Sequence, residues 1–275
     1  MTNDLHPLAP RLHPSLLAVI LGALALAACS SHSSIATENA PSTETVAGEE
    51  TQGAAPRVLF VLSTHDTMAG EPTGAFLPEL AHGFLVFEEA GWAVDFVSPN
   101  GGRIPLYAGD DDERSQAFMQ REELVARLHR SMTPADVDAS AYAAIYFVGG
   151  HGTMWDFPNQ PALASLGEAI YAQGGIVSAV CHGPAGLIGL RDDNGEPLIR
   201  GRRVAAFTDD EERAVGHEEH VPFLLQSRLE ELGATVVTQP IWQPNVQTDG
   251  RLVTGQNPAS AEGVAQAVVE LLEAP

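Results

Sequence analysis

The chain has 275 residues, with 36 acidic side chains against 14 basic ones and a formal net charge of −22 at pH 7. This acidity argues against binding to nucleic acid and against electrostatic docking on anionic lipid. The part from Arg57 to Pro275 has the length and the apolar content of one domain with its own core.

The N-terminal segment is typical of a bacterial signal peptide. An unbroken apolar stretch runs from Leu16 to Ala28, long enough for a signal h-region and too short to span a bilayer. It ends in Leu26-Ala27-Ala28-Cys29, which resembles a lipobox. That resemblance implies a lipoprotein: residues 1–28 are removed and Cys29 carries the acyl anchor. The alternative is an ordinary cleaved signal with an incidental cysteine.

The lipobox resemblance also implies a location. Ser30 follows the cysteine where Asp would retain a lipoprotein at the inner membrane, so we expect lipid anchoring to the outer membrane of a bacterial cell envelope, facing the periplasm. Residues 29–56 then form the acylated cysteine and a tether, which is rich in Ser, Thr, Glu, Ala and Pro and contains no aromatic residue. Such a composition predicts disorder.

Strands and helices alternate in residues 57–275. The expected strands are Val58–Leu62, Ala93–Val97, Tyr142–Val148, Ile176–Val180, Arg203–Ala206, Ala234–Val237 and Leu252–Thr254. The expected helices are Phe76–Ala90, Arg121–Ser131, Pro161–Gln173, Val221–Leu232 and a last one from Ser260, and Asn100–Ser115 is expected to be a polar loop. This order predicts an α/β fold with a mostly parallel sheet covered by helices on both faces.

Cys181 directly follows the buried strand Ile176–Val180. Ala179 and Gly183 flank it with the spacing of a nucleophile elbow, a tight turn that holds its central residue in a strained, exposed conformation. A thiol at the start of a helix is favoured as the reactive thiolate. The alternative is a buried structural cysteine. Because Cys29 is the only other cysteine and would be acylated, a single thiol kept in an oxidising compartment favours the nucleophile.

Other candidate catalytic or ligand-binding residues also follow predicted strands. Gly149, Gly150 and His151 come after Tyr142–Val148, and ligands of such folds bind beyond the carboxyl ends of strands. Glycines there let backbone N–H groups approach a ligand, as an oxyanion hole requires. Trp155 is suited to a pocket wall, and His151 is either a pocket donor or a buried structural histidine.

Five segments together resemble the DJ-1/PfpI superfamily, and more closely its Hsp31-like branch, which includes glutathione-independent glyoxalases of the glyoxalase III type. They are Thr73–His82, Gly149–Asp156, Ala179–Ala185, Phe207–Glu212 and Leu252–Ser260, in the order of that family. The resemblance implies a flavodoxin-like three-layer sandwich, related to class I glutamine amidotransferases. Those enzymes take their histidine from far downstream, whereas this chain has none after His220.

The resemblance also assigns roles to residues. Cys181 is the nucleophile, His182 its base and Glu212 the acid that orients His182, with Glu211 as the alternative acid. Glu79 is a further catalytic carboxylate beside the thiol, and Gly150 with the amide of His182 forms the oxyanion hole. A base of this kind needs a third group to fix its tautomer.

Other polar residues near these segments receive no catalytic role. We expect no metal, because His82 and Glu79 lack further ligands, and no cofactor. His217-Glu218-Glu219-His220 is expected to be a solvated helix start. In the loop Ile104–Tyr107, Tyr107 stands where the Hsp31-like pattern has Asp. This departure affects the expected geometry of the cap or of the edge used in a homodimer, and not the expected chemistry.

The expected function is conversion of methylglyoxal or a related 2-oxoaldehyde to a 2-hydroxy acid, with a small aldehyde as the partner molecule. Cys181 would form a hemithioacetal, and Glu79 with His182 would move protons through an enediol. A thiol hydrolase acting on peptides, amides or glycated adducts is the alternative within the same superfamily. A stress holdase in which Cys181 senses oxidation is the alternative of another class.

Overall fold

The computed structural model describes residues 55–107 and 112–274, which belong to one unit, Gln52–Pro275. The predicted signal peptide, Cys29 and the tether up to residue 54 lie outside the described residues. Within the described ranges, no helix is long and apolar enough to cross a membrane.

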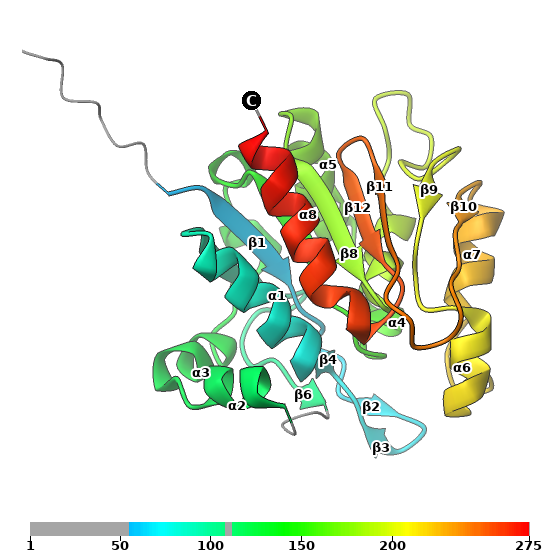
Figure 1. The fold of residues 1–275 in the computed structure, drawn as a ribbon, viewed down its shortest axis with the longest axis horizontal. Coiled ribbons are helices and arrows are strands. Elements are labelled where there is room, and N and C mark those ends of the chain that lie inside the picture. Colours follow the sequence, from blue (N-terminus) through cyan, green and yellow to red (C-terminus); the bar gives the residue numbers. More distant parts are fainter. Residues whose placement is uncertain (1–54, 108–111, 275) are drawn as a thin grey trace, which may run out of the picture. The chain divides into compact units, whose positions relative to one another are not determined.

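A six-stranded sheet forms the centre of the fold (Figure 1). Its strands, in spatial order, are β11 (Val246–Asp249), β12 (Leu252–Gly255), β8 (Ile176–Val180), β7 (Ala144–Phe147), β1 (Arg57–Val61) and β5 (Ala93–Val97). All neighbouring pairs are parallel except β11 and β12. The predicted mostly parallel sheet is therefore confirmed, and the one antiparallel strand lies at an edge.

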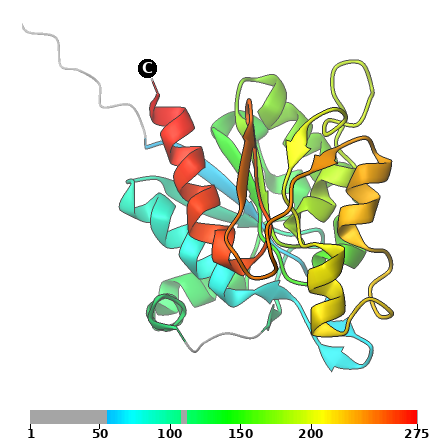
Figure 2. The same ribbon diagram turned by 45° about the vertical axis from the view of Figure 1, so that its right-hand side comes forward.

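Side chains alternate between the two faces of this sheet and fill two separate cores. Phe60 and Tyr146 stack at 4.7 Å on the face covered by α1 (Leu77–Glu89) and α8 (Ala261–Glu273), which lie side by side in Figures 1 and 2. Leu59 and Ile145 belong to the opposite core, with α5 (Pro161–Ala172) and α7 (Leu225–Glu231). Period-two burial on both faces accounts for the near-continuous apolar strands, and it confirms the three-layer sandwich.

Short elements connect these layers. Three two-stranded sheets are formed by β2 (Thr67–Met68) with β3 (Glu71–Pro72), β4 (Ala75–Phe76) with β6 (Leu106–Tyr107), and β9 (Arg203–Val204) with β10 (Thr235–Val236). The remaining α-helices are α2 (Glu113–Met119), α3 (Glu122–Leu128), α4 (Thr153–Asp156) and α6 (Asp209–Val215), and the described chain also has short 3-10 helices at Pro134–Asp136, Ala139–Ala141, Gly183–Ile188 and Pro258–Ser260.

The structure differs from the predicted elements in several places. The strands expected at 203–206 and 234–237 pair with each other outside the main sheet, as β9 and β10. The polar segment 100–115 contains β6 and the start of α2. Helix α2 begins there because the side chain of Asp112 caps it by accepting from the N–H of Ser115 at 2.9 Å.

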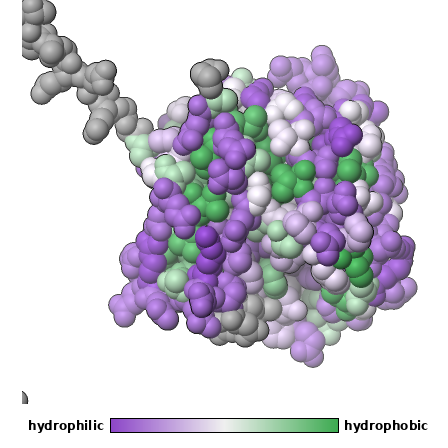
Figure 3. All heavy atoms as spheres, in the orientation of Figure 1, coloured by the Kyte–Doolittle hydropathy of each residue, from purple (hydrophilic) through white to green (hydrophobic). Residues whose placement is uncertain are grey.

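The surface is largely polar. The face shown in Figure 3 is mostly hydrophilic, with separate hydrophobic patches between the hydrophilic residues. The exposed large hydrophobic residues of the described chain are Val215, Ile241, Trp242 and Leu271.

Candidate active site

Cys181 occupies a strained turn at the carboxyl end of β8. Its φ is +58°, in the left-handed region that non-glycine residues rarely adopt. A Cβ on Gly183 would lie 2.1 Å from the carbonyl oxygen of Phe147, so this position requires glycine. The backbone is held on both sides: the N–H of Cys181 donates to Gly255 O at 3.0 Å, and its carbonyl accepts from Phe207 N at 2.8 Å. The turn has the strained backbone of the predicted nucleophile elbow, but its cysteine is buried rather than exposed.

His182 and Glu212 complete a hydrogen-bonded chain from the thiol. Nδ1 of His182 lies 3.3 Å from Sγ of Cys181, and its Nε2 is 2.8 Å from Oε2 of Glu212. Hydrogen bonds from His182 and His151 hold the pKa of the Glu212 carboxyl well below its usual value against the effect of burial, whereas burial lowers the pKa of His182 to about 4. Neutral His182 therefore donates Nε2–H to an ionised Glu212, which leaves Nδ1 free to take the thiol proton.

Glu211 and Glu212 have different partners, which separates the two candidate acids. Glu211 accepts from Thr208 in a capping box at the start of α6, and its other oxygen accepts from Asn257 Nδ2 at 2.8 Å and from Trp242 N at 3.0 Å. Of the two carboxylates, Glu212 alone has a hydrogen bond to His182. Glu211 thus holds the loop around Trp242, and we propose Glu212 as the acid of the triad.

Replacement of the two carboxylates should separate these roles. Glu212→Gln should lower the turnover number about 10²- to 10⁴-fold, because the amide no longer stabilises the charged form of His182. Glu211→Gln should chiefly reduce thermal stability through the loss of a buried charged acceptor. Steady-state kinetics and thermal unfolding of both variants provide the measurement. Equal kinetic losses in the two variants, with Glu211→Gln as stable as the native protein, would contradict the assignment.

Glu79 comes from the first turn of α1 and is fully buried. A Cβ on Gly149 would lie 2.3 Å from Oε2 of Glu79 and 2.8 Å from Cβ of Cys181, so a glycine is needed where the carboxylate and the thiol meet. Among the described residues, neither carboxylate oxygen has a hydrogen bond of ordinary geometry. Burial raises the pKa of Glu79 to about 8, although the nearby thiol and the Gly149 N–H oppose that shift.

The expectation of a resting thiolate is corrected by this environment. The turn after Cys181 continues into a six-residue 3-10 helix, Gly183–Ile188, rather than an α-helix with a substantial dipole. Cys181 is 4% exposed. Burial and the adjacent Glu79 raise the pKa of the thiol well above its usual value, and the His182 N–H only partly offsets this. Cys181 is therefore a thiol at rest, and a reaction at its sulfur would require its proton to pass to a base such as the adjacent His182.

A cavity of about 220 Å³ opens over these groups. Its wall includes Cys181, His182, Glu79, Gly150 and His151, together with Phe76, Tyr107, Phe207, Val215, His217, Trp242 and Pro258. Gly150 has φ +104°, and a Cβ there would lie 2.2 Å from Gly74 O, so glycine is required. The predicted site residues Glu79, Gly150, His151, Cys181 and His182 thus share this cavity, and Glu212 lies behind it, hydrogen-bonded to His182 and His151.

Trp155 and His217 lie where the sequence did not place them. The ring of Trp155 stacks on His65 at 4.7 Å, away from the cavity, because Asp156 accepts from the N–H of His65 and fixes that segment. The aromatic wall is formed instead by residues such as Trp242 and Phe207. His217 is not at a helix start: it lines the cavity 5.0 Å from His151, ring to ring, and α7 begins only at Leu225.

The metal-binding potential of the described residues is confined to the triad region. His151, His182 and Glu212 have ligand atoms within 4.8 Å of one another. In the structure these atoms are joined by hydrogen bonds between the two imidazoles and the carboxylate, so a metal ion would have to displace the hydrogen bonds of the triad. His82 lies apart, between Asp112 and Glu262, and packs at the surface of α1 as expected.

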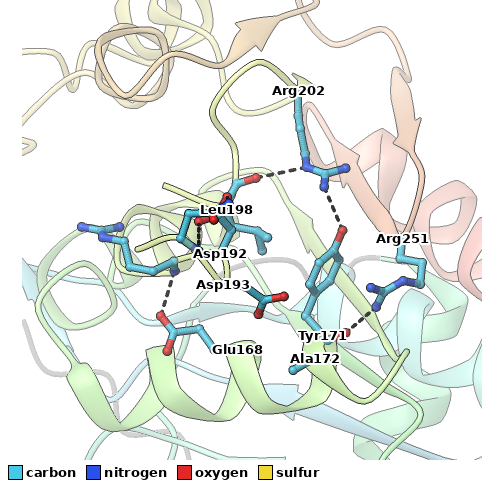
Figure 4. Close-up of a pocket in the computed structure, with 10 residues that line it drawn as sticks. Glu168, Tyr171, Ala172, Asp192, Asp193, Leu198, Arg202 and Arg251 are labelled. Atoms are coloured by element: carbon cyan, nitrogen blue, oxygen red, sulfur yellow. Dashed lines mark hydrogen bonds between the residues drawn. The ribbon is translucent and has the colours of Figure 1, made fainter. Parts of the chain in front are cut away.

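A second hollow, of about 440 Å³, is lined by residues such as Tyr171, Arg202 and Arg251 (Figure 4). Arg251 directly precedes β12 and donates to the carbonyl of Gly175 just before β8, so this hollow lies at the amino ends of the two strands, whereas Cys181 follows the carboxyl end of β8. Its arginines donate to acceptors of the protein: Arg202 to the hydroxyl of Tyr171 at 2.9 Å, Arg251 to the Tyr171 carbonyl at 2.6 Å, and Arg191 to Ile188 O at 2.9 Å. Because these cations serve the fold, the chemistry is assigned to the edge that carries Cys181.

Comparison with known proteins agrees with this geometry. A model of the DJ-1/PfpI family matches residues 75–271. The chain belongs to the DJ-1/PfpI family. Among curated relatives, this DJ-1/PfpI protein is 33% identical over 237 residues to the glutathione-independent glyoxalase HSP31 of Saccharomyces cerevisiae, covering 79% of this chain and 98% of the relative. It is also 33% identical over 233 residues to glyoxalase 3 of Candida albicans, with the same coverage.

Solved structures give the same family. Glyoxalase III from Candida albicans has a TM-score of 0.71 and 31% identity, with 78% of this chain and 97% of that chain covered. Rapid Encystment Protein 24 kDa from Francisella tularensis has a TM-score of 0.77 and 38% identity, with 80% of this chain and 100% of that chain covered. The flavodoxin-like fold and the Hsp31-like resemblance predicted from the sequence are confirmed.

The predicted location is wrong by the same comparisons. The two curated relatives named above are yeast proteins, and 98% of the length of each is matched by 79% of this chain. Yeasts have no bacterial cell envelope, and about a fifth of this chain has no counterpart in either relative. The apolar stretch before Cys29 satisfied the pattern of a lipoprotein signal, but a short apolar run with a cysteine is a weak pattern that the relatives do not support.

Proposed function

We propose that this DJ-1/PfpI protein is a glutathione-independent glyoxalase that converts methylglyoxal, or a related 2-oxoaldehyde, to a 2-hydroxy acid without a cofactor. The observation that carries the proposal is the buried carboxylate of Glu79 beside the thiol of Cys181, with a second carboxylate, Glu212, already engaged by His182. Isomerisation of an aldehyde adduct needs a base for a carbon-bound proton in addition to the base for the thiol.

The first half of the proposed reaction forms the carbon–sulfur bond. His182 Nδ1 takes the proton of Cys181, and the sulfur adds to the aldehyde carbon of the substrate. The resulting alkoxide takes a proton from His182, which gives a neutral hemithioacetal. The N–H groups of Gly150 and His182 are proposed to hold the developing oxyanion at the mouth of the turn.

The second half moves hydrogen between neighbouring carbons. Ionised Glu79 removes the proton from the carbon bonded to sulfur, which gives an enediolate, and returns a proton to the adjacent carbon. The hydroxyl proton passes to the neighbouring oxygen, so the product is the thioester of a 2-hydroxy acid on Cys181. Water then cleaves the thioester to release the acid and regenerate the thiol. Oxidation at one carbon balances reduction at the other, and no external redox partner is needed.

The cavity favours this substrate class over the alternatives. A volume of about 220 Å³ suits a small molecule better than a folded peptide segment. The described lining contains no Lys or Arg, so it suits an uncharged aldehyde. A holdase would need a broad exposed apolar surface. The exposed large hydrophobic residues that the structure describes are few, with Trp242 at 45% exposure belonging to the cavity wall.

The direct test is incubation of the purified full chain with methylglyoxal in the absence of glutathione, with lactate measured over time. Time-dependent formation of lactate supports the proposal. Consumption of a peptide or amide substrate without any lactate from methylglyoxal would favour a hydrolase that uses the same triad.

The pH dependence of the reaction should report the ionisation of Glu79. Because burial raises the pKa of this carboxyl to about 8, only about a tenth of the molecules carry the ionised base at pH 7. We expect kcat/KM for methylglyoxal to rise roughly tenfold per pH unit at acidic pH and to level off above about pH 8. His182 stays neutral over this range, since its pKa is lowered to about 4. A profile that is flat from pH 6 to 9 would contradict Glu79 as the carbon base.

A further inference from the structure

Glu212 binds two histidines rather than one. Its Oε2 accepts from His182 Nε2 at 2.8 Å, and its Oε1 accepts from His151 Nε2 at 2.9 Å. Because the carboxyl is ionised, each imidazole presents a donor Nε2–H to it. In the neutral form of either ring, the unprotonated nitrogen is then Nδ1. The carboxylate thus fixes the same tautomer in two neighbouring histidines.

The two imidazoles face different parts of the site. Nδ1 of His182 points to the sulfur of Cys181 at 3.3 Å, and its side chain is 1% exposed. The side chain of His151 is 11% exposed and lines the cavity, and its Nδ1 has no hydrogen-bond partner among the described residues. His182 is therefore placed to exchange a proton with the sulfur, and His151 to exchange a proton with a small molecule that enters through the cavity.

The reaction proposed above contains a step that needs such a base. Cleavage of the thioester requires water to lose a proton while it attacks the carbonyl carbon. Once the sulfur carries the acyl group, that group separates His182 from water in the cavity. The ring of His151 lies 4.1 Å from that of His182, so it borders the same reaction space from the open side.

From this arrangement we propose that His151 is the general base of thioester hydrolysis, an inference that rests on the proposed glyoxalase function. Nδ1 of His151 takes a proton from water as the oxygen bonds to the carbonyl carbon. The carbon–sulfur bond then breaks, and the thiolate recovers a proton from the released acid by way of His182. The products are the 2-hydroxy carboxylate, the Cys181 thiol and one proton on His151.

His217 lies next to His151 at the wall of the cavity. Its ring lies 5.0 Å from His151, edge to face, and is half-buried. Burial and the neighbouring His151 lower the pKa of His217, so a positive charge on this second imidazole is disfavoured. The groups facing His151 are thus Glu212, His182, His217 and the apolar ring of Phe207 at 6.1 Å.

His151→Gln separates a base from a positioning residue. The glutamine amide can still donate to Glu212, but it has no basic nitrogen. We expect the variant to form the adduct with methylglyoxal at a rate close to that of the native protein. We expect its rate of lactate release to be at least about 100-fold lower. Excess methylglyoxal is removed by rapid gel filtration, and hydroxylamine is then added. Lactohydroxamate identifies the accumulated thioester, whereas a hemithioacetal returns methylglyoxal on dilution.

Controls make each outcome informative. His82→Gln, a histidine at the surface of α1, should release lactate at the native rate, and Glu79→Gln should accumulate no thioester. Release of lactate by His151→Gln at the native rate, or loss of adduct formation itself, overturns the inference. If the glutamine variant does not fold, His151→Ala is used, and imidazole added to its isolated thioester should accelerate lactate release. Failure of the glyoxalase proposal is a different result: the native protein itself would form no lactate.

Discussion

Replacement of Cys181 by alanine is expected to reduce lactate formation from methylglyoxal to the uncatalysed rate while the fold stays intact. Without the sulfur no hemithioacetal forms, so the substrate is not held covalently next to Glu79 and His182. Alanine at this turn has the same steric cost at φ +58° as cysteine and removes a single atom from a buried site. Lactate assays and thermal unfolding of the variant provide the measurement.

The sharpest control for this variant is Cys181→Gly. Glycine adopts positive φ without strain, so its thermal stability should be at least that of Cys181→Ala, whereas its activity should be equally absent. Retention of most of the activity by either variant would remove Cys181 from the mechanism. Loss of folding in both would instead show that the thiol has a structural role in the turn.

Replacement of Glu79 by glutamine is expected to change activity and stability in opposite directions. Lactate formation should fall about 10²- to 10⁴-fold, because the amide cannot take the carbon-bound proton. The free energy of unfolding above about pH 8 should rise by a few kcal/mol, since one pKa unit corresponds to about 1.4 kcal/mol. Denaturant unfolding of both proteins at several pH values, together with lactate assays, tests both effects.

The sign of the stability change follows from the raised pKa of Glu79, about 8 in the folded protein against a reference value of 4.5. The folded state binds the proton more tightly than the unfolded state, so the contribution of this group is complete below about pH 4.5 and is lost as pH rises through about 8. Glutamine does not ionise, so the variant does not lose this contribution to the free energy of unfolding as pH rises. Glu89→Gln, an exposed change on the same helix, is the matched control. An unchanged pH dependence in Glu79→Gln would contradict a buried, protonated carboxyl.

The fold was predictable where periodicity and burial act locally. Strands at Ala93–Val97 and Ile176–Val180 were predicted with their observed bounds, because each is an apolar run bounded by turn residues. Strand β11 was missed, since Val246–Asp249 is mostly polar and is defined by pairing with β12 rather than by its own pattern. Partners of short strands such as β9 depend on tertiary packing, which local sequence does not encode.

The site was predictable in its residues but not in its electrostatics. The family resemblance identified Cys181, His182, Glu79 and Glu212; the structure brings the first three to one cavity and places Glu212 behind His182. The raised pKa of the thiol depends on burial beneath distant segments, which no motif shows. His217 was taken for a surface residue because its Glu-rich neighbourhood suggested a solvated helix. Its place beside His151 results from the backbone bond between the N–H of His217 and Glu212 O, at 3.1 Å.

The active site is supported from both faces of the sheet. Glu79 belongs to α1, which packs with α8 in one core, and Cys181 itself belongs to that core. Ala185 and Leu187, which follow the cysteine, pack with α7 in the opposite core. A substitution in that second core is therefore expected to shift the backbone of the turn while the packing of α1 around the thiol is kept, so each face of the sheet offers its own place for adjusting the site.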